Sequence, residues 1–543
     1  MNKIFTQLIA KRHLTDDFLH PKYENLTPPL VLPDMKKALE RVKKAIKSQE
    51  KILIYGDYDV DGVTASTLME QALIQAGAAP HNLEIILPDR FIDGYGMSER
   101  LITYAKKHQI TLVITVDCGS RNHAIIDKLN HLKIDTIVTD HHECEDTLPE
   151  AIAVVNPHRH DYTGPKSVKN LAGVGVAFKL AQGLVEEGLI KNGQEKWLLD
   201  LVLLGTLCDS MDLTRENRIL TYFGKIVLEK TRRKGLLEIM KNASVKRVTS
   251  ESIGFQIGPR LNAAGRLDTA EISLNLLRTS SATEAAKLGA MLEELNKKRR
   301  TSQRAATSEI AERLKTHTSK HQNPVIIETG HWHEGILGIV AGRLVEQYHQ
   351  PAFVLTEVED GIFKGSGRSF GEFNLAEALS FAKDTILGGG GHAAAAGVQV
   401  AREHLDEFKE KINQYYKSLN LKNQERFMHC QADLVVTGLN DFSLDLLDNL
   451  SLLEPFGPMN EEPVFCLKDA NILEMRRMGS DGAHLRLDLR GRDGGTVKSV
   501  AFSAPESWFR LDDATSHTFL IQPTANEWNG TRSIEARLID VLD

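Results

Sequence analysis

Four short apolar runs in the first 140 residues each end in an acidic residue or a histidine. The length and β-branched content of these runs are typical of buried parallel strands. Ligands of open α/β sheets lie beyond the carboxyl ends of the strands, so we expect the polar residues after the four runs to meet at one sheet edge. The runs are Ile52–Tyr55, Leu83–Leu87, Leu112–Val116 and Ile134–Thr139.

The polar residues after these runs form a predicted acidic cluster with two histidines. Carboxylates held this close repel one another unless cations neutralise them. Oxygen ligands with one or two imidazoles suit Mn²⁺ or Mg²⁺, and the absence of a thiolate set disfavours structural zinc. We therefore expect a site for two divalent cations. The residues are Asp57, Asp59, Asp61, Asp89, Asp117, Asp140, His141 and His142.

Position along the strands suggests a role for several residues. Asp59 and Asp61 stand where the chain turns after the first strand and can reach different cations, and Asp117, at the end of the third strand, is placed to bridge them. Asp140 can accept a hydrogen bond from an imidazole and so fix its tautomer. Asp209 ends a later apolar run and can complete the ligand set.

Each residue taken alone has a simpler explanation. An aspartate after a strand is more often the N-cap of the next helix than a metal ligand. The repeated aspartates of Asp57–Asp61 also resemble a Ca²⁺ loop, but the EF-hand pattern with a glutamate at position 12 is absent. The occurrence of several such ends on one sheet edge favours the metal site. Asp89 has no metal role in this scheme and is expected to cap or orient its own loop.

The composition excludes several classes of protein. No apolar stretch approaches 18 residues, so we expect no membrane-spanning helix. The first seven residues lack the apolar core of a signal peptide, and the five cysteines form no CxxC pattern. Both features suit the reducing cytoplasm. The net charge of −7 does not exclude a nucleic-acid ligand, because local basic surface matters more than the total.

The chain length of 543 residues indicates three or more domains. Strand and helix patterns alternate to about residue 155, with helices expected at 34–48, 62–75 and 124–132, as in an α/β fold with a parallel sheet. Residues 280–320 contain no proline and one glycine, which predicts one long helix or two in series. We assign 1–270 to the metal-binding α/β domain, 271–320 to a connecting helix, 321–422 to a second, smaller α/β domain and 423–543 to a C-terminal β domain.

Short alternating strand patterns, punctuated by turn signals, predict that the C-terminal domain is a small closed β-barrel of the OB type. Such barrels bind single strands by combining a basic groove with stacking aromatics. The expected strands are Phe427–Val436, Val464–Arg476, His484–Leu489, Val497–Ser503 and Ser533–Val541. The candidate stacking residues, most of which also suit a barrel core, are Phe456, Phe502, Trp508, Phe509 and Trp528.

Two glycine-rich segments of the second α/β domain are candidate phosphate-binding loops. Arg368 and Ser369 lie in the first, and Gly390, Gly391 and His392 lie in the second. Glycine lets a backbone approach a phosphate closely, and an arginine or imidazole adds charge or a donor. A tight turn without a ligand is the simpler explanation of either segment.

A third candidate segment precedes the long helix and carries Arg260, Asn262 and Arg266 among small residues. Two guanidiniums spaced by small residues allow a nucleic-acid backbone to lie close, and Asn262 can donate to a phosphate. The alternative is a structural loop with surface arginines. The basic run at 297–300 of the long helix can line the same groove, although a solvated face is the more common explanation of such a run.

Six segments form a recognisable set: Tyr55–Gly62, Asp117, Asp140–His142, Gly258–Arg266, His333–Gly335 and Gly389–His392. The set resembles the DHH phosphoesterase superfamily and, within it, the RecJ family of single-strand-specific exonucleases, over nearly the whole chain. The resemblance implies that the second α/β domain is of the DHHA1 type and that His333 contacts a phosphate. It implies that the metal ligands are Asp59, Asp61, Asp117, His141 and Asp209, with Asp117 bridging. Asp57, Asp140 and His142 would be catalytic neighbours of these ligands.

By this resemblance, we expect a metal-dependent exonuclease that degrades single-stranded DNA from the 5′ end and releases 5′-mononucleotides in DNA repair and recombination. The expected cofactors are two Mn²⁺ or Mg²⁺ ions, and the expected partners are single-stranded DNA, a helicase and a single-strand-binding protein. We expect a monomer. Two alternatives remain open. A phosphodiesterase for short RNAs or cyclic dinucleotides would not need the long helix or the barrel, and a non-catalytic DNA-binding scaffold would lack the expected ligands.

Overall fold

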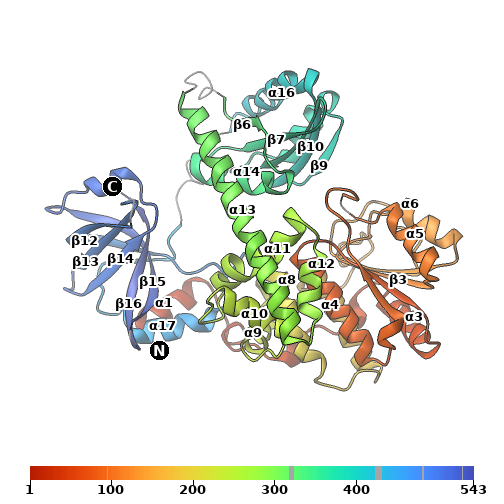
Figure 1. Ribbon diagram of the computed structural model, residues 1–543. Helices are drawn as coiled ribbons and strands as arrows, with labels where there is room; N and C mark the ends of the chain where they lie inside the picture. The colour runs from red at the N-terminus through yellow and green to blue at the C-terminus, as the bar shows by residue number, and fades with distance from the viewer. Residues whose placement is uncertain (95, 317–322, 422–430, 480–481, 529, 543) are drawn as a thin grey trace. The chain divides into compact units, whose positions relative to one another are not determined.

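Two units make up the chain, whose computed structural model describes residues 1–94, 96–316, 323–421, 431–479, 482–528 and 530–542 (Figure 1). The first unit comprises Met1–Gly258, Leu274–Ala285 and Cys430–Asp543, and the second comprises Pro259–Ser273 and Ala286–His429. None of the helices in the described ranges is long and apolar enough to cross a membrane.

The first unit contains a parallel sheet of five strands in the order β2-β1-β3-β4-β5. The strands are β1 (Ile52–Tyr55), β2 (Leu83–Ile86), β3 (Leu112–Val116), β4 (Asp135–Thr139) and β5 (Ala153–Val155). The four predicted strands are therefore confirmed. In an open sheet of this order, the direction of winding reverses between β1 and β3, and the crevice beyond their carboxyl ends is the usual ligand site.

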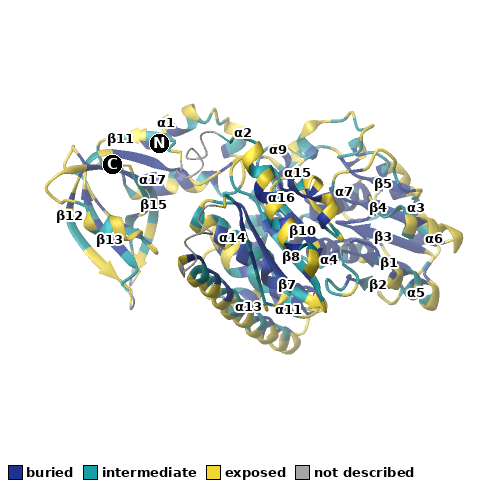
Figure 2. Ribbon diagram, turned by 90° about the horizontal axis from the view of Figure 1, so that it is seen from above, coloured by how far each residue is buried: buried dark blue, intermediate teal, exposed yellow. Residues whose placement is uncertain are grey.

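Helices pack on both sides of these strands, which Figure 2 colours as buried. Side chains of α5 and α6 share one core cluster with Leu53 and Val113, whereas α4 contacts β1 and β3 and packs in turn on α7 and α8. The three helices expected in this region are confirmed. The bounds are α3 (Met35–Lys47), α4 (Val60–Gln75), α5 (Glu99–His108), α6 (His123–His131), α7 (Gly173–Glu186), α8 (Leu199–Cys208), α9 (Arg215–Glu229) and α10 (Lys234–Asn242).

A helical stretch follows, which begins with a π-helix at Ser252–Ile257 and continues as α11 (Gly258–Leu267), α12 (Glu271–Arg278) and α13 (Ala282–Thr316). The long predicted helix is confirmed as α13, and its expected end at residue 320 lies outside the described residues. The segment with Arg260 and Arg266 is helical rather than a loop, because its alanines and Leu261 are buried on one side of α11.

The second unit contains a mixed sheet in the order β6-β7-β8-β10-β9. α14 contacts β7 and β8 and shares a core cluster with residues of α13, β6 and β7. Residues of α15 and α16 belong to another cluster, which includes Phe353 and Phe408. The bounds are β6 (Ile326–Gly330), α14 (Leu337–Tyr348), β7 (Ala352–Glu359), β8 (Ile362–Arg368), α15 (Leu375–Phe381), β9 (Gly388–Gly391), β10 (Ala395–Ala401) and α16 (Leu405–Ser418).

Both glycine-rich segments form strands rather than loops, which corrects the sequence-based expectation. In β8, a Cβ at Gly365 would lie 2.5 Å from Leu355 and one at Gly367 would lie 2.6 Å from Phe353. In β9, Gly389 and Gly391 have φ angles of 150° and 158°, and a Cβ at either would collide with the backbone of β10. Glycine is used here because neighbouring side chains or strands leave no room for a Cβ.

The C-terminal sheet has the order β11-β12-β13-β14-β16-β15 and closes into a barrel through β12–β15 pairing, as expected. Its elements are β11 (Leu434–Val436), α17 (Leu444–Leu450), β12 (Phe465–Met478), β13 (His484–Arg490), β14 (Thr496–Ala501), β15 (Ser516–Trp528) and β16 (Thr531–Val541). The sequence missed β15, because Pro523 argues against a central strand. Residues 427–430 of the first expected strand lie outside the described residues.

The first helices of the chain, α1 (Lys3–Lys11) and α2 (Asp16–Leu19), pack with this barrel. Phe5 and Leu8 are fully buried in the same core cluster as Phe465 and Phe519. Arg12 forms a two-point ion pair with Asp433, with nitrogen–oxygen distances of 2.6 and 2.8 Å. Residues 1–19, which the sequence grouped with 20–270, thus share a core with the barrel.

A buried arginine joins α9 to α2 and to the segment between α17 and β12. The guanidinium of Arg218, which is 2% exposed, donates to the backbone carbonyls of Phe18, Leu452, Leu453 and Glu454 at 2.6–3.0 Å. These carbonyls would lose their donors together if the guanidinium were removed.

We predict that Arg218→Met lowers the free energy of unfolding by about 3 kcal/mol, because several buried carbonyls lose their hydrogen bonds at once. Arg215→Met makes the same chemical change at an exposed position of α9 and should shift it by no more than about 0.5 kcal/mol. Urea denaturation followed by circular dichroism measures both. Equal midpoints for the two variants would show that Arg218 does not stabilise this junction.

Candidate metal centre

The turn after β1 holds three aspartates at the start of α4. Asp59 is the N-cap of this helix, and its Oδ1 accepts hydrogen bonds from the backbone N–H of Asp61 at 2.9 Å and of Gly62 at 3.1 Å. A Cβ at Gly62 would overlap the backbone of Asp57. Glycine therefore lets α4 begin directly against Asp57, which keeps the three carboxylates within one short turn.

Asp61 lies at the start of a second helix as well. Its Oδ2 accepts a hydrogen bond from the N–H of Gly173 at 2.6 Å, and its Oδ1 accepts one from Val174 at 2.9 Å. These donors are the first residues of α7, where an anion is favoured. A Cβ at Gly173 would lie 2.5 Å from Asp117, so α7 approaches the sheet edge only because this residue is glycine.

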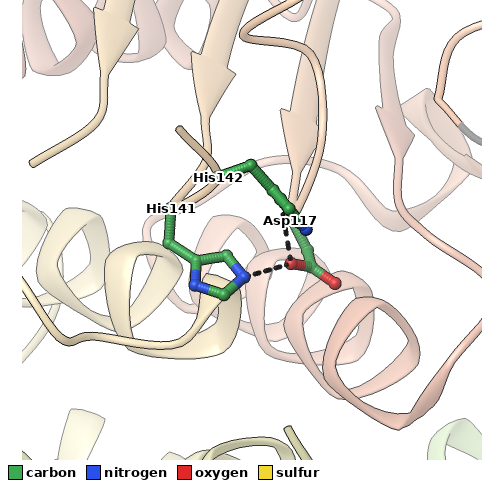
Figure 3. A group of neighbouring side chains, drawn as sticks. All are labelled: Asp117, His141 and His142. Atoms are coloured by element: carbon green, nitrogen blue, oxygen red, sulfur yellow. Dashed lines mark ion pairs between the residues drawn. The ribbon is translucent and has the colours of Figure 1, made fainter. Parts of the chain in front are cut away.

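Asp117 ends β3 in a strained conformation that turns its carboxylate into the cluster. Its φ is +61°, in the left-handed region that a non-glycine residue seldom adopts, and such strain tends to gather at functional sites. Oδ1 of Asp117 lies 3.1 Å from Nε2 of His141 and 4.0 Å from Nδ1 of His142. Figure 3 shows the carboxylate with both imidazoles directed toward it.

Nε2 of His141 lies near three carboxylates of the cluster. Besides Asp117, its Nε2 lies 3.6 Å from Oδ2 of Asp209 and 3.9 Å from Oδ2 of Asp61. The predicted residues fall into three groups whose possible ligand atoms lie within 4.8 Å of one another. The groups are Asp117 with His141 and His142, Asp61 with His141 and Asp209, and Asp57 with Asp59 and Asp117.

The carboxylates of this cluster resist ionisation together. Burial, and then the charge of Asp59, raises the pKa of Asp57 to about 8 and that of Asp61 to about 7. Burial and the charge of Asp61 raise the pKa of Asp209 to about 8 and that of Asp117 far above its usual value. Ionisation of several of these carboxyl groups at once therefore requires a positive partner at this edge.

Asp140 accepts hydrogen bonds from residues that belong to the cluster or lie beside it. Its Oδ1 accepts hydrogen bonds from Nδ1 of His142 at 2.8 Å and from the N–H of His141 at 2.8 Å, and its Oδ2 accepts one from Ser120 at 3.0 Å. Burial would raise the pKa of Asp140, but the hydrogen bond from His142 and the nearby imidazoles hold it well below the usual range. Burial would lower the pKa of His142, but the bond to Asp140 and its charge raise it to about 9.

The donor set fits divalent cations. Burial lowers the pKa of His141 to about 3, so its ring is neutral and one ring nitrogen can bind a metal ion; Nε2 is the nitrogen that faces the three carboxylates. Oδ1 of Asp117 is buried and has no hydrogen-bond partner among the described residues. Carboxylate oxygens gathered around one imidazole nitrogen mark a place for a cation, and this donor set suits Mn²⁺ or Mg²⁺.

Sequence reasoning missed Asn156, which supports the cluster from the end of β5. Its Nδ2 donates to Oγ of Ser120 and to the carbonyl of His142, both at 2.8 Å. The rule that found the aspartates, a polar residue directly after a buried run, would also have found Asn156. Asp89 caps its own loop as expected, because its Oδ1 accepts from the N–H groups of Phe91 and Ile92.

The remaining candidates lie in the second unit. Arg260 forms a two-point ion pair with Glu293 of α13, with distances of 2.6 and 3.2 Å. Asn262 and Arg266 are partly exposed and four residues apart on α11, so they share a side of this helix. Nδ1 of His333 accepts a hydrogen bond from Gly335 at 3.1 Å, just before α14 begins.

The other candidates of this unit lie along β8, β9 and the turn that follows β9. The guanidinium of Arg368 donates to Ser366 and to the carbonyl of Gly367, and the hydroxyl of Ser369 donates to the carbonyl of Phe373. His392 is exposed in the turn between β9 and β10.

Two exposed glycines on β9 and β10 leave part of the backbone uncovered by side chains. A Cβ at Gly390 would meet nothing within 4 Å, and Gly390 pairs with the exposed Gly397. Bare backbone of this kind gives a phosphate close access.

Comparison with known proteins agrees with this geometry. Models of the DHH family N-terminal domain, the DHHA1 domain and the RecJ OB domain match residues 51–206, 322–418 and 433–540. The single-stranded-DNA-specific exonuclease RecJ of Haemophilus influenzae is 31% identical over 99% of this chain and 96% of its own length. The chain belongs to the RecJ family.

Other members of the RecJ family show the same likeness. The Bacillus subtilis protein is 34% identical over 96% of this chain, which spans 65% of the length of that relative. The crystal structure of RecJ from Thermus thermophilus in complex with Mn²⁺ matches with a TM-score of 0.83 and 27% identity. The match covers 100% of this chain and 76% of the Thermus thermophilus chain.

In this RecJ-family chain, we expect removal of the Asp117 carboxylate to raise the stability of the metal-free protein but to weaken metal binding, whereas removal of the Asp61 carboxylate should lower that stability. We predict that Asp117→Asn raises stability in EDTA by about 1 kcal/mol, because burial forces the Asp117 carboxyl either to take up a proton or to stay charged, and a neutral amide avoids both costs. Asp61→Asn should lower stability, because an amide cannot accept from Gly173 and Val174 through both of its heavy atoms.

Differential scanning fluorimetry with EDTA and with Mn²⁺ tests this pair. The parent chain should gain about 2.7 kcal/mol at a Mn²⁺ concentration 100 times Kd, and the Asp117→Asn variant should gain far less. An Asp117→Asn variant that is destabilised in EDTA, or that keeps the full Mn²⁺ gain, contradicts the assignment.

Proposed function

We propose that the chain is a metal-dependent exonuclease that degrades single-stranded DNA from the 5′ end and releases 5′-mononucleotides. The observation that carries this proposal is the convergence of three carboxylates on Nε2 of His141, at 3.1, 3.6 and 3.9 Å, beside a second acidic group that shares Asp117. Relatives that are 31–34% identical are single-stranded-DNA-specific exonucleases, which supports this substrate and reaction.

We assign two divalent cations, Mn²⁺ or Mg²⁺, to this cluster. The ligands are Asp59, Asp61, Asp117, His141 and Asp209, with Asp117 shared between the two cation sites. RecJ of Thermus thermophilus has been solved in complex with Mn²⁺ and with Mg²⁺, which supports the choice of metal. When bound, such a pair lowers the pKa of a water molecule and stabilises negative charge on the phosphoryl group.

The neighbouring residues orient the reactants. Asp140 holds the ring of His142 through Nδ1, so that the other ring nitrogen can donate to a phosphate oxygen. Asp57 adds negative charge beside Asp59, which strengthens the attraction for cations. No protein nucleophile is required, because a water molecule attacks the phosphorus while the P–O3′ bond breaks, which leaves a 3′-hydroxyl on the released mononucleotide and a 5′-phosphate on the remaining strand.

The second unit supplies candidate contacts to the DNA backbone. Arg368 and His392 carry donors at the ends of β8 and β9, and the bare backbone at Gly390 and Gly391 permits close approach of a phosphate. Ser369 and His333 provide further polar groups near the same strands and α14. On α11, Arg260, Asn262 and Arg266 are assigned to strand guidance.

We further propose a cytoplasmic monomer that acts in DNA repair and recombination. As partners we propose a helicase that exposes single strands and a single-strand-binding protein that covers them. The barrel and the long helix α13 favour a DNA substrate over short RNAs or cyclic dinucleotides, because a dinucleotide needs no extended binding surface.

The test uses single-stranded DNA labelled at the 5′ or the 3′ end, the matching duplex, and a short RNA, each with Mn²⁺. We predict immediate release of the 5′ label as a mononucleotide from single strands, late release of the 3′ label, and little cleavage of the duplex. Asp117→Ala should lower the rate more than about 1,000-fold, a loss of about 4 kcal/mol of transition-state stabilisation.

Asp127→Ala removes an exposed carboxylate of α6 and serves as the matched control with unchanged activity. Early release of the 3′ label would contradict the proposal that degradation starts at the 5′ end. Substantial activity of Asp117→Ala would refute the shared-ligand role.

Substitution of Arg260 tests the proposed contacts to the DNA backbone. We predict that Arg260→Ala weakens binding of single-stranded DNA and lowers the slope of log K against log salt by about 0.7, the value for one lost phosphate contact. Glu293→Ala removes its ionic partner and should not lower this slope. The inactive Asp117→Ala background permits fluorescence-anisotropy titrations at several salt concentrations. An unchanged slope in Arg260→Ala would exclude a phosphate contact.

A further inference from the structure

A cavity of about 420 Å³ lies in the first unit and shares no lining residue with the metal centre. Residues from α4, α10, α12 and the segments beside α8 and α10 form its wall. The residues that matter to the argument are Gln71, Trp197, Asp200, Arg232, Lys234 and Arg278. The helices that meet here are labelled α4, α8, α10 and α12 in Figure 1.

Two antiparallel helices separate this cavity from the metal ligands. α4 carries Asp61 near its start and Gln71 ten residues later, about 15 Å along the helix axis. α8 runs between Asp200 at its start and Asp209, its C-cap, which is a similar length. The cavity therefore lies at the far end of both helices and is distinct from the metal centre.

The wall of the cavity carries excess positive charge. Arg233 is held by the buried Asp200, with 2.9 Å between Nε and Oδ2, and Arg278 pairs with Glu70. Arg232 and Lys234 are exposed, and within the part of the chain that the structure describes neither has a carboxylate partner. Two cations at the cavity thus remain free to bind an anion.

Hydrogen bonds to a buried carboxylate hold the basic segment Arg232–Lys234 in place. Asp200 also accepts a hydrogen bond from Oγ1 of Thr231 at 2.9 Å, so one buried carboxylate anchors both Thr231 and Arg233. A Cβ at Gly235 would overlap the carbonyl of Leu276, which fixes the start of α10 against the end of α12. The free N–H groups at that start add a preference for anions.

An aromatic surface lies beside this charge. Trp197 is 49% exposed, and Cζ of Arg232 lies 5.6 Å from the centroid of its ring. Indole rings and guanidinium planes are the surfaces on which nucleobases stack. A flat aromatic group next to unpaired cations matches a base with its phosphate better than it matches an acidic peptide, which gains nothing from a stacking face.

We propose that this cavity is a second nucleotide-binding site, with a base stacked on Trp197 and a phosphate held by Arg232 and Lys234. The nucleotide belongs either to a DNA strand or to a free mononucleotide, because both present the same base and phosphate. The proposal does not depend on the proposed nuclease activity, since binding at this site involves neither the metal ligands nor bond cleavage.

The experiment measures binding of dAMP and of a fluorescein-labelled oligo(dT) to the full-length Asp117→Ala chain in EDTA. The test variants are Trp197→Ala and the double variant Arg232→Ala/Lys234→Ala. The control is Lys36→Ala/Lys47→Ala, which removes two exposed lysines of α3. Circular dichroism checks that every variant is folded, and an acidic peptide of glutamates serves as a third ligand.

We expect each test variant to weaken binding of at least one nucleotide ligand about tenfold, as loss of a stacking partner does, and the control to bind like the parent. Weakening of dAMP binding assigns the site to a free mononucleotide, and weakening of oligo(dT) binding alone assigns it to the strand. The proposal is overturned if neither nucleotide ligand is affected, or if only the peptide responds to the loss of Arg232 and Lys234. Nuclease assays of the same variants in the active chain report separately on the proposed function.

Discussion

Repulsion among buried carboxylates at the carboxyl ends of β1 and β3 is the constraint on which the rest of the first unit depends. The local backbone is arranged to hold these groups together against that repulsion. Asp59 caps α4, Asp61 receives the first two N–H groups of α7, and Asp117 adopts a left-handed conformation at the end of β3. Gly62 and Gly173 allow the two helices to approach because neither position has room for a Cβ. Hydrogen bonds and close packing between protein groups thus position the members of the cluster.

The same constraint separates two kinds of residue around the cluster. Asp140 accepts several hydrogen bonds and is satisfied by its protein partners, whereas Oδ1 of Asp117 has no hydrogen-bond partner among the described residues and faces the ring of His141. A satisfied carboxylate orients its neighbours, and an unsatisfied one attracts a cation. This difference in hydrogen bonding supports assigning Asp140 to orientation and Asp117 to metal binding. Asp61 combines both properties, since it caps α7 and also lies 3.9 Å from Nε2 of His141.

Prediction from the sequence succeeded where one local pattern determines the structure and failed where the reason lies in a neighbouring element. Strands β1 to β4 of the first sheet were predicted closely, because each is an uninterrupted apolar run of the right length, whereas the three-residue strand β5 was not predicted. The strand β15 was missed, since Pro523 is unfavourable within a sheet and only pairing with β16 reveals its place. The glycines of β8 were interpreted as a phosphate loop, yet Gly365 and Gly367 are small because Leu355 and Phe353 pack against them. Asn156 was overlooked although it follows β5 as the aspartates follow their strands.

By itself, the sequence determined the fold class, the set of acidic and imidazole groups at one sheet edge and the chemistry they favour. These properties follow from residue type and from periodicity along the chain, which are local. Only the tertiary structure decided that Nε2 of His141 faces three carboxylates, that Arg260 is paired with Glu293, and that residues 1–19 share a core with the barrel. Such contacts join residues that are distant in sequence, and their partners are selected by packing and by charge across elements, which no local pattern records.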